Sequence, residues 1–255
     1  MSKVVIITGS ASGIGLEIAK AFLDSNYKVV FSDINARALD GVVKQYNKSN
    51  NCMGVVCDVS NEEQVKELVS KTHESYKRID VFINNAGLQY VANIEDFPTN
   101  KFETMIKIML VGAFMSTKYV LPIMKKQQFG RIINMSSING LIGFASKAAY
   151  NSAKHGLIGL TKVTALECAK HGITANAICP GYIDTPLVRG QMQDLANNRG
   201  VSLEQVLDEV LFPLIPQKKL IDIKDVAELA LFIASDSAKH ITGQSLVIDA
   251  GYTAQ

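Results

Sequence analysis

The feature that most constrains the fold is a regular alternation of short apolar runs with stretches that have helical apolar spacing. Each apolar run ends in glycine or polar residues, as buried parallel strands do. The runs comprise residues 4–7, 28–32, 52–57, 79–83, 131–137, 173–178 and 245–248. The helical stretches comprise residues 15–23, 36–46, 62–76, 100–126, 147–170 and 223–234, and we expect the stretch 100–126 to be interrupted near Gly112 and Pro122. This alternation with short links predicts an α/β fold, a doubly wound parallel sheet of about seven strands with helices on both faces.

The link between the first strand and the first helix is rich in glycine. Residues 8–15 read Thr-Gly-Ser-Ala-Ser-Gly-Ile-Gly. Glycine lets the backbone approach a pyrophosphate closely, and the helix start that follows offers free N–H groups and a favourable dipole. We therefore predict a Rossmann-type dinucleotide site. Its expected cofactor contacts are Gly9, Ser12, Gly13, Ile14 and Gly15. The spacing differs from Gly-x-Gly-x-x-Gly, so an ordinary tight turn is the alternative.

A carboxylate, Asp33, follows the second strand. At this place it suits the ribose hydroxyls of an adenosine and repels a 2′-phosphate. Ser10 and Ala11 add no positive charge to the glycine turn, so the sequence favours NAD over NADP, although Arg37 lies nearby. A helix N-cap is the competing interpretation of Asp33.

Further polar residues follow other strands of the predicted sheet. In doubly wound sheets the ligands gather at the carboxyl ends of the strands. The residues that fall at that edge are Gly9, Asp33, Asp58, Asn85 and Ser137. Their agreement indicates a ligand crevice along this edge.

Tyr150 and Lys154 are four residues apart, so on a helix they share one face. Ser137, at the end of the preceding strand, can reach them if that strand end faces the helix start. An ammonium near a phenol favours the phenolate, which predicts a lowered pKa for Tyr150 and a general acid/base near neutral pH. Taken alone, Tyr-x-x-x-Lys is a weak motif that most often marks a solvated helix face.

Composition excludes several classes of function. With 255 residues, of which 47% are hydrophobic, the chain suits one domain over residues 1–255. The net charge of +2 without a basic block gives no reason to expect nucleic acid or a membrane as partner. We expect no signal peptide or membrane span, and a cytoplasmic location. The cysteines lack C-x-x-C spacing and are predicted to be buried free thiols: Cys52, Cys57, Cys168 and Cys179.

Two helical regions raise questions beyond the sheet. The helix predicted over residues 147–170 contains Gly156 and Gly159, which indicates a close helix–helix contact, either between subunits or within one. Residues 186–219 interrupt the alternation with helical apolar spacing, and Gly190 and Gly200 could act as hinges. An insertion after a strand's carboxyl end would cover the crevice, so we predict a substrate lid.

These motifs together resemble the short-chain dehydrogenase/reductase family over essentially the whole chain. The resemblance rests on the glycine turn, residues 84–87 (Asn-Asn-Ala-Gly), Ser137, Tyr150-x-x-x-Lys154 and Pro180-Gly181. It implies that Tyr150 is the general acid/base, that Lys154 lowers its pKa and holds the nicotinamide ribose, and that Ser137 bonds the reacting oxygen. It also implies a homotetramer and no metal in the chemistry. Beyond the glycine turn and Asp33, the expected cofactor-binding residues are Asp58, Val59, Asn85, Ala86, Gly87, Tyr150, Lys154, Pro180, Gly181, Ile183 and Thr185.

Within that family the chain is similar to the bacterial D-3-hydroxybutyrate dehydrogenases, on the segments 87–98, 143–150, 185–191 and 254–255. This resemblance implies that Gln89, Lys147 and Gln191 hold the substrate carboxylate. Asn139 stands where the group has a histidine, and Tyr182 and Tyr252 stand where it has indoles; these three are also predicted to line the substrate site. Met109 stands where the family has a catalytic asparagine, whose amide hydrogen bonds a thioether cannot replace.

The predicted function is NAD-dependent interconversion of D-3-hydroxybutyrate and acetoacetate. One alternative is another member of the family that acts on a different small hydroxy or keto compound, such as a 3-oxoacyl thioester. A second is a cofactor-binding regulator with little catalysis, which Met109 favours. The substrate is in each enzymatic case a small molecule.

Overall fold

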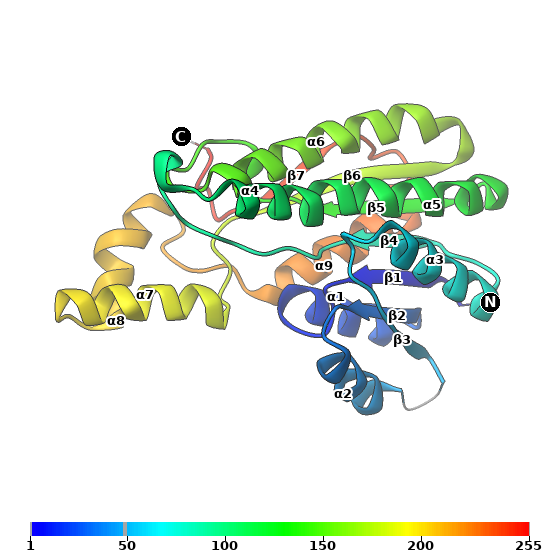
Figure 1. Cartoon of the computed structure of the whole chain (residues 1–255), viewed down its shortest axis with the longest axis horizontal. Coiled ribbons are helices and arrows are strands. Elements are labelled where there is room, and N and C mark those ends of the chain that lie inside the picture. The colour runs from blue at the N-terminus through cyan, green and yellow to red at the C-terminus, as the bar shows by residue number, and fades with distance from the viewer. Residues whose placement is uncertain (1, 48–49, 255) are drawn as a thin grey trace.

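The computed structural model describes residues 2–47 and 50–254, without the side chains of residues 186, 187, 191, 194, 195 and 198 in α7. The described residues form one seven-stranded sheet, parallel throughout, in the order β3-β2-β1-β4-β5-β6-β7 (Figure 1). Its strands are β1 (Val4–Thr8), β2 (Lys28–Asp33), β3 (Cys52–Val56), β4 (Val81–Asn84), β5 (Gly130–Met135), β6 (Ile173–Pro180) and β7 (Ser245–Ile248). The predicted doubly wound parallel sheet in a single Rossmann-like domain is confirmed.

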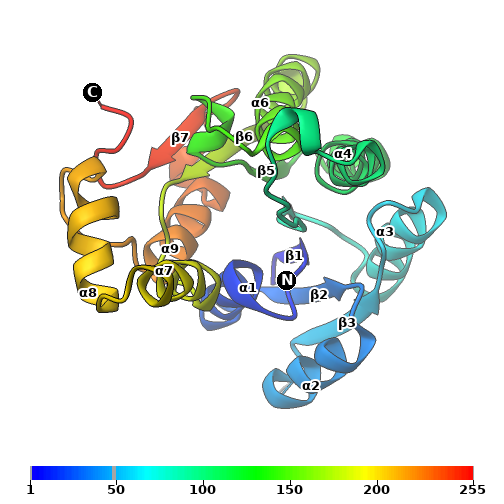
Figure 2. The same ribbon diagram turned by 60° about the vertical axis from the view of Figure 1, so that its left-hand side comes forward.

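Helices cover both faces of the sheet (Figures 1 and 2). One layer contains α1 (Gly13–Asp24), α2 (Ala36–Tyr46) and α9 (Ile223–Ala234). The opposite layer contains α3 (Glu62–Tyr76), α4 (Thr99–Ile106), α5 (Gly112–Gln127) and α6 (Ala148–Cys168). The remaining helices are α7 (Pro186–Arg199) and α8 (Leu203–Val206). Two layers of helices explain why the central strands are buried on both sides and are therefore continuously apolar rather than alternating.

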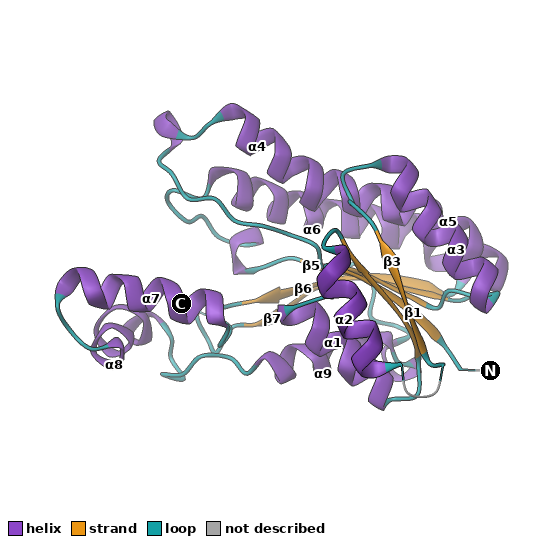
Figure 3. Cartoon of the chain, turned by 60° about the horizontal axis from the view of Figure 1, so that its bottom comes forward, coloured by secondary structure: helices purple, strands orange, loops and turns teal. Residues whose placement is uncertain are grey.

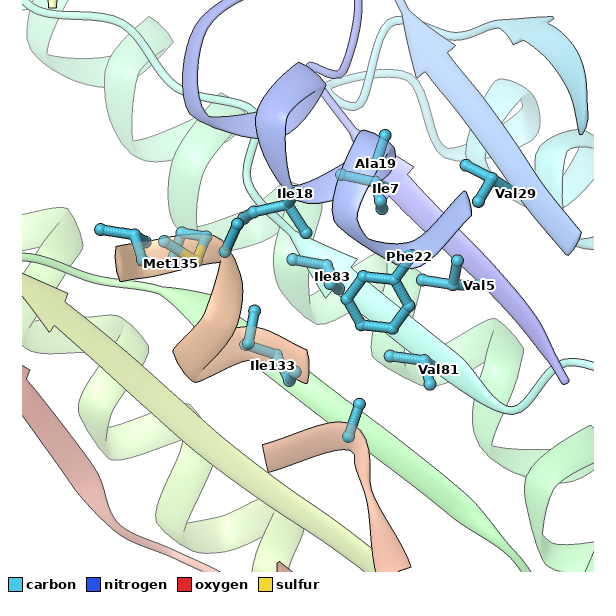
Figure 4. Close-up of a cluster of buried hydrophobic side chains, with 14 of the residues drawn as sticks. Val5, Ile7, Ile18, Ala19, Phe22, Val29, Val81, Ile83, Ile133 and Met135 are labelled. Carbon is cyan, nitrogen blue, oxygen red and sulfur yellow. The ribbon is translucent and has the colours of Figure 1, made fainter. Parts of the chain in front are cut away.

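The packing under α1 illustrates this core (Figure 4). Ile18 and Phe22, one helical turn apart, are fully buried and point toward the β1 and β4 side chains Val5, Val81 and Ile83. Burying a side chain of this size stabilises the fold by about 1.5–3 kcal/mol, so the apolar face of α1 fixes the helix against the sheet. That position in turn places the start of α1 at the carboxyl end of β1.

The helical stretch before β5 differs in detail from the prediction. A π-helical turn, Lys107–Val111, joins α4 to α5, and it accounts for the interruption expected near Gly112. A Cβ on Gly112 would lie 2.9 Å from the carbonyl oxygen of Val59, so the glycine permits close packing. The break expected at Pro122 is wrong: Pro122 lies inside α5 on an exposed side. There water can satisfy the carbonyl that the missing N–H leaves free.

The span Thr99–Gln127 is, among the described helices, the one long and apolar enough by composition to cross a membrane. It lies against α3 and α6 on one face of the sheet, and a core helix of a globular domain meets the same criterion.

One of the two glycines of α6 makes the predicted close helix–helix contact, and it makes this contact within the chain. A Cβ on Gly156 would lie 2.6 Å from a methyl carbon of Leu110, in the π-helical turn. Gly159 has no neighbouring atom within 4 Å of that position and faces outward. The intramolecular alternative thus explains Gly156. All four cysteines are buried and free, as predicted.

Residues 186–214 extend beyond the carboxyl ends of the strands (Figure 3). Gly190 lies inside α7, whereas Gly200 ends α7 with a left-handed backbone (φ 67°). Leu207 and Leu211 of this segment, with Ile215 just after it, form a small buried cluster, against which Tyr182 and Tyr252 pack. This cluster joins the segment to the rest of the fold next to the ligand edge of the sheet.

Candidate active site

The glycine turn packs tightly against the end of β4. Gly9 has a left-handed backbone (φ 63°), and a Cβ on it would lie 2.9 Å from Cα of Ala86. A Cβ on Gly15 would collide with the carbonyl oxygen of Gly9. The Asn85 side chain donates to the carbonyl oxygens of Thr8 (2.9 Å) and Gly9 (3.1 Å). The turn and the strand end are thus locked together through backbone atoms.

Asp33 closes the other end of this turn. One carboxylate oxygen accepts from the Ala11 N–H (3.1 Å) and the other from the Asn35 N–H (2.9 Å). The N-cap of α2 is Asn35, whose side chain accepts from the Ala38 N–H (3.1 Å). The competing interpretation of Asp33 as a helix N-cap is therefore wrong.

Between these elements runs a cavity of about 790 Å³, which we call the cofactor groove. Gly13 is left-handed (φ 56°) with open space where a Cβ would be, so a phosphate can approach its backbone. The groove and its donor set therefore fit a dinucleotide. The predicted cofactor residues that line it are Gly9, Ser12, Gly13, Ile14, Asp33, Asp58, Val59, Asn85, Ala86, Gly87 and Thr185. Gly15, also predicted to contact the cofactor, is buried and is not among the residues that line the groove.

A second cavity, of about 290 Å³, shares five lining residues with the groove, and we call it the catalytic cavity; the shared residues are Ile14, Asn85, Gly87, Leu88 and Thr185. It brings together the three predicted catalytic residues, Ser137, Tyr150 and Lys154. Four predicted substrate residues also line it: Gln89, Asn139, Lys147 and Tyr182. The cofactor residues Pro180, Gly181 and Ile183 complete the wall toward β6.

Lys154 is buried (5% exposed) beneath Tyr150. Its ammonium donates to the carbonyl oxygen of Met135 (2.6 Å) and lies 5.3 Å from the centre of the Tyr150 ring. Burial lowers the pKa of Lys154 to about 8, and the nearby Cys179 opposes this shift. The ammonium thus faces the ring and a carbonyl rather than the phenol oxygen.

The pKa of Tyr150 differs from the prediction. Burial raises it, while a hydrogen bond with Ser137 opposes the increase. The expected lowering by Lys154 is therefore wrong for this structure. The physical reason is that both groups lie out of water, where charge on either is disfavoured, and the lysine is directed toward Met135.

Ser137 begins a short 3₁₀ turn, Ile138–Gly140, and is almost fully buried. Its hydroxyl donates to Oδ1 of Asn139 (3.2 Å) and accepts from the Asn139 N–H (3.2 Å). The Asn139 amide then donates to Oδ1 of Asn151 (3.1 Å). Sequence reasoning missed Asn151, although its place next to Tyr150 in Tyr-x-x-x-Lys was a signal.

The loops that carry Gln89 and Lys147 are joined to each other. The Ala92 N–H donates to the Ser146 carbonyl (3.0 Å), and the Ser146 hydroxyl donates to the Asn93 side chain (2.8 Å). Ser146 has a left-handed backbone (φ 62°), a conformation unusual for a non-glycine residue. These two bonds hold it and so fix the position of Lys147, the N-cap residue of α6.

Lys147 is partly buried, and burial lowers its pKa. Its ammonium lies 5.3 Å from the centre of the Phe144 ring. Among the described residues, Lys147 and Lys154 are the charged side chains that line the catalytic cavity. An anionic group is the natural complement of this lining.

The aromatic side chains near the catalytic cavity lie in two layers. Tyr182 lines the cavity, but Tyr252 packs behind it, with ring centres 5.7 Å apart. Tyr252 also stacks on Phe144 at 5.9 Å. Tyr252, predicted to line the substrate site, contacts Tyr182 and is not among the residues that line the cavity here. Phe144 is an aromatic that sequence reasoning missed. The Gln191 side chain lies outside the described residues.

Met109 lies in the π-helical turn and is buried (2% exposed). It packs with Met105, Ala149 and Ala153, and Tyr150 packs against the same cluster. Its sulfur lies 3.5 Å from the position of a Cβ on Gly87. A fully apolar contact thus occupies the place of the family's amide.

Comparisons with known proteins agree with this geometry. A family model described as enoyl-(acyl carrier protein) reductase matches residues 9–253. An uncharacterised oxidoreductase of Bacillus subtilis, YxjF, is 52% identical over 254 residues, covering 99% of each chain. D-beta-hydroxybutyrate dehydrogenase of Rhizobium meliloti is 40% identical over 259 residues, covering 100% of each chain. A crystal structure of actinorhodin polyketide ketoreductase with NADPH has a TM-score of 0.91 at 31% identity, covering 98% of this chain and 97% of that one. A match over nearly the whole length, with relatives at this identity and coverage, confirms the expected resemblance: the chain belongs to the short-chain dehydrogenase/reductase family of oxidoreductases that bind a nicotinamide cofactor.

Proposed function

We propose that the protein interconverts D-3-hydroxybutyrate and acetoacetate with NAD as cofactor. The observation that carries this proposal is the position of Lys147 in the catalytic cavity with Tyr150 and Ser137. A carboxylate bound by Lys147 leaves the hydroxyl of a short 3-hydroxy acid near the phenol. The 40% identity to a D-beta-hydroxybutyrate dehydrogenase supports the same substrate.

In the oxidation, Tyr150 accepts the proton of the substrate hydroxyl, and in the reduction it returns that proton to the carbonyl oxygen. Ser137 and Tyr150 together hold the reacting oxygen, while Lys147 and Gln89 orient the carboxylate. The residues that line the cofactor groove would hold a nicotinamide dinucleotide, which would supply the hydride acceptor or donor for C3 of the substrate. Lys154 lies beneath the Tyr150 ring and is held there by its bond to the Met135 carbonyl.

The preference for NAD rests on Asp33. Its carboxylate lines the far end of the cofactor groove, where an NADP phosphate would meet negative charge. Residues 186–219 act in this proposal as a lid that covers the catalytic cavity and brings Gln191 to the carboxylate. A homotetramer and a cytoplasmic location belong to the same proposal, on the family resemblance.

A 3-oxoacyl thioester is the second candidate substrate, because a relative that is 35% identical over 250 residues is named a 3-oxoacyl-[acyl-carrier-protein] reductase. It has no free carboxylate for Lys147, so the two candidates differ in their dependence on this lysine. A cofactor-binding regulator would show no turnover with either.

The test compares D-3-hydroxybutyrate with a neutral secondary alcohol of similar size, by the absorbance of reduced nicotinamide. A charge-assisted hydrogen bond contributes ~1.5–3 kcal/mol, so Lys147→Ala should lower kcat/KM for the acid roughly 10- to 150-fold and barely affect the neutral alcohol. Lys162→Ala, at an exposed position of the same helix, is the matched control. Equal losses on both substrates, or better turnover of the neutral alcohol by the unmodified enzyme, would exclude the carboxylate site.

A further inference from the structure

The ammonium of Lys147 has an aromatic ring beside it where a buried charge more often has a carboxylate. It lies 5.3 Å from the centre of the Phe144 ring, within the distance at which a ring face attracts a cation. Lys147 is partly buried, and none of the described carboxylates makes an ion pair with it. The face of Phe144 therefore offsets part of the cost of removing this charge from water.

A second ring contacts Phe144 in turn. Tyr252 stacks on Phe144, with 5.9 Å between the ring centres and 27° between the ring planes. Tyr252 also contacts Tyr182, a residue of the catalytic cavity, at 5.7 Å. Ring pairs prefer particular offsets and angles, so the position of Phe144 depends on where the C-terminal turn places Tyr252.

The turn that carries Tyr252 is fixed by Asp249, the residue that directly follows β7. The buried Asp249 carboxylate accepts from the Gly251 N–H (2.9 Å), the Thr253 N–H (2.7 Å) and the Thr253 hydroxyl (2.6 Å). Ala250 has a left-handed backbone (φ 55°), which these bonds hold in place. The end of β7 thus determines where the Tyr252 ring lies.

We propose that Phe144 is a positioning residue for Lys147: its ring keeps the ammonium at the wall of the catalytic cavity, ready for an anionic substrate group, and the C-terminal turn holds the ring through Tyr252. A lysine on a mobile stem loses rotamer freedom when it binds an anion, whereas a lysine that is already held has lost much of it. The inference rests on the proposed binding of a carboxylate by Lys147, and it adds that a turn about a hundred residues further along the chain contributes to this affinity.

The position of Lys147 on the ring can be tested without any substrate. In protein labelled with ¹³C at the lysine Cε atoms, the Lys147 signal is the one that disappears in Lys147→Arg. We expect the ring current of Phe144 to shift its methylene protons upfield, and Phe144→Leu to return them to the range of the exposed lysines. A Lys147 signal within that range in the unmodified protein would overturn the inference, whatever the substrate is.

Two matched ligands test the consequence for binding. Butyrate carries a carboxylate and butyramide has the same shape without the charge, and neither has a hydroxyl to oxidise. Their Kd values are measured by NMR titration of the protein saturated with NAD. Phe144→Leu keeps an apolar side chain but removes the ring, so it should weaken butyrate binding roughly 3- to 10-fold, the effect of one side chain that must be immobilised. Butyramide should bind equally well to both proteins.

Phe144→Tyr is the conservative variant, because a tyrosine ring also attracts a cation with its face. It should bind butyrate within about twofold of the unmodified protein. A loss in Phe144→Tyr as large as that in Phe144→Leu would show that the ring face is not what holds Lys147.

Tyr252→Leu tests the contribution of the C-terminal turn. If Tyr252 acts through Phe144, this substitution should weaken butyrate binding by itself and weaken it no further when Phe144→Leu is already present. Additive losses would show that Tyr252 acts through Tyr182 instead, and would contradict the proposed role of the turn.

Phe129→Leu is the matched control for the loss of a ring next to a cation. Phe129 lies just before β5, at the edge of the sheet opposite the ligand edge, with Lys3 and Arg131 at 4.6 Å and 4.3 Å from its ring centre. Its substitution should leave the affinities for butyrate and butyramide unchanged.

The same measurements separate this inference from the proposed function. If Lys147→Ala weakens butyrate binding and Phe144→Leu does not, the inference is wrong and the carboxylate site stands. If the unmodified protein binds butyrate no more tightly than butyramide, the proposed function is contradicted. The upfield shift of Lys147 then still decides whether Phe144 holds the ammonium.

Discussion

The cofactor groove and the catalytic cavity adjoin each other but are built differently. In the groove, the polar side chains bond to backbone: Asn85 to Thr8 and Gly9, and Asp33 to the N–H groups of two neighbouring turns. In the catalytic cavity, polar side chains bond largely to one another, from Ser137 to Asn139 to Asn151. Because the backbone partners in the groove do not change with sequence, the groove needs particular residue types at these positions. In the catalytic cavity several bonded side chains can be replaced together by others that still form hydrogen bonds.

The two regions also differ in how their charges are treated. The Asp33 carboxylate accepts two backbone hydrogen bonds. Lys147 and Lys154 lie at least partly buried, and neither makes an ion pair with any of the described residues. Desolvation of an unpaired charge costs free energy, so these two lysines lower the free energy of unfolding of the protein. We therefore expect substitutions in the catalytic cavity to lower activity without lowering stability. In the cofactor groove we expect activity and stability to change together.

We expect the largest loss of activity from a substitution of Tyr150. Tyr150→Phe keeps the ring that packs beside Met105 and Met109 but removes the transferable proton. We expect kcat to fall by about 10²–10⁴ and the melting temperature to stay close to that of the unmodified protein. A variant that keeps most of its activity would show that Tyr150 is not the acid/base. A large fall in the melting temperature would contradict the expectation that activity in the catalytic cavity can be lost without loss of stability.

Lys154→Met should abolish most activity yet stabilise the cofactor-free protein. Burial lowers the pKa of Lys154 from 10.5 to about 8, which corresponds to a destabilisation of about 3 kcal/mol at pH 7. Methionine removes this cost but loses the bond to the Met135 carbonyl, worth about 1 kcal/mol. We therefore expect a net gain of about 1–3 kcal/mol in the free energy of unfolding, measured by denaturant titration.

The stability gained in Lys154→Met should depend on pH, because folding lowers the pKa of Lys154. Below pH 8 the lysine is charged in both states, and the full cost is present. Between pH 8 and 10.5 the unfolded chain keeps the proton that the folded protein loses, so the cost shrinks as pH rises. The advantage of Lys154→Met should narrow over the same range. Lys162→Met, at an exposed lysine of α6, should show no such dependence.

The smallest effect is expected in the groove, at Asp33. Asp33→Ala removes the negative charge that disfavours a 2′-phosphate, so the ratio of kcat/KM for NAD to that for NADP should fall by roughly 10-fold, about 1.4 kcal/mol. Asp40→Ala, an exposed carboxylate on α2, is the matched control. If the unmodified protein uses NADP as efficiently as NAD, our interpretation of Asp33 is wrong.

Much of the groove could be predicted because its requirements are local. The alternation of apolar runs and amphipathic stretches leads to a parallel sheet, and the residue after each strand then lies at its carboxyl edge. A left-handed turn beside a strand end requires glycine, as Gly9 does with a Cβ position 2.9 Å from Ala86. The four-residue spacing of Tyr150 and Lys154 likewise suffices to predict that they share a helix face.

What only the tertiary structure decided depends on contacts between segments far apart in the chain. The pKa of Tyr150 rises because layers from several elements bury it, whereas the pair of residues by itself predicts a decrease. Tyr252 packs against Tyr182, and Asn151 is hydrogen-bonded to the Ile142 carbonyl and to Asn139. Period and residue type determine backbone geometry within one element, but burial and hydrogen-bond direction are set by whichever atoms the fold brings alongside.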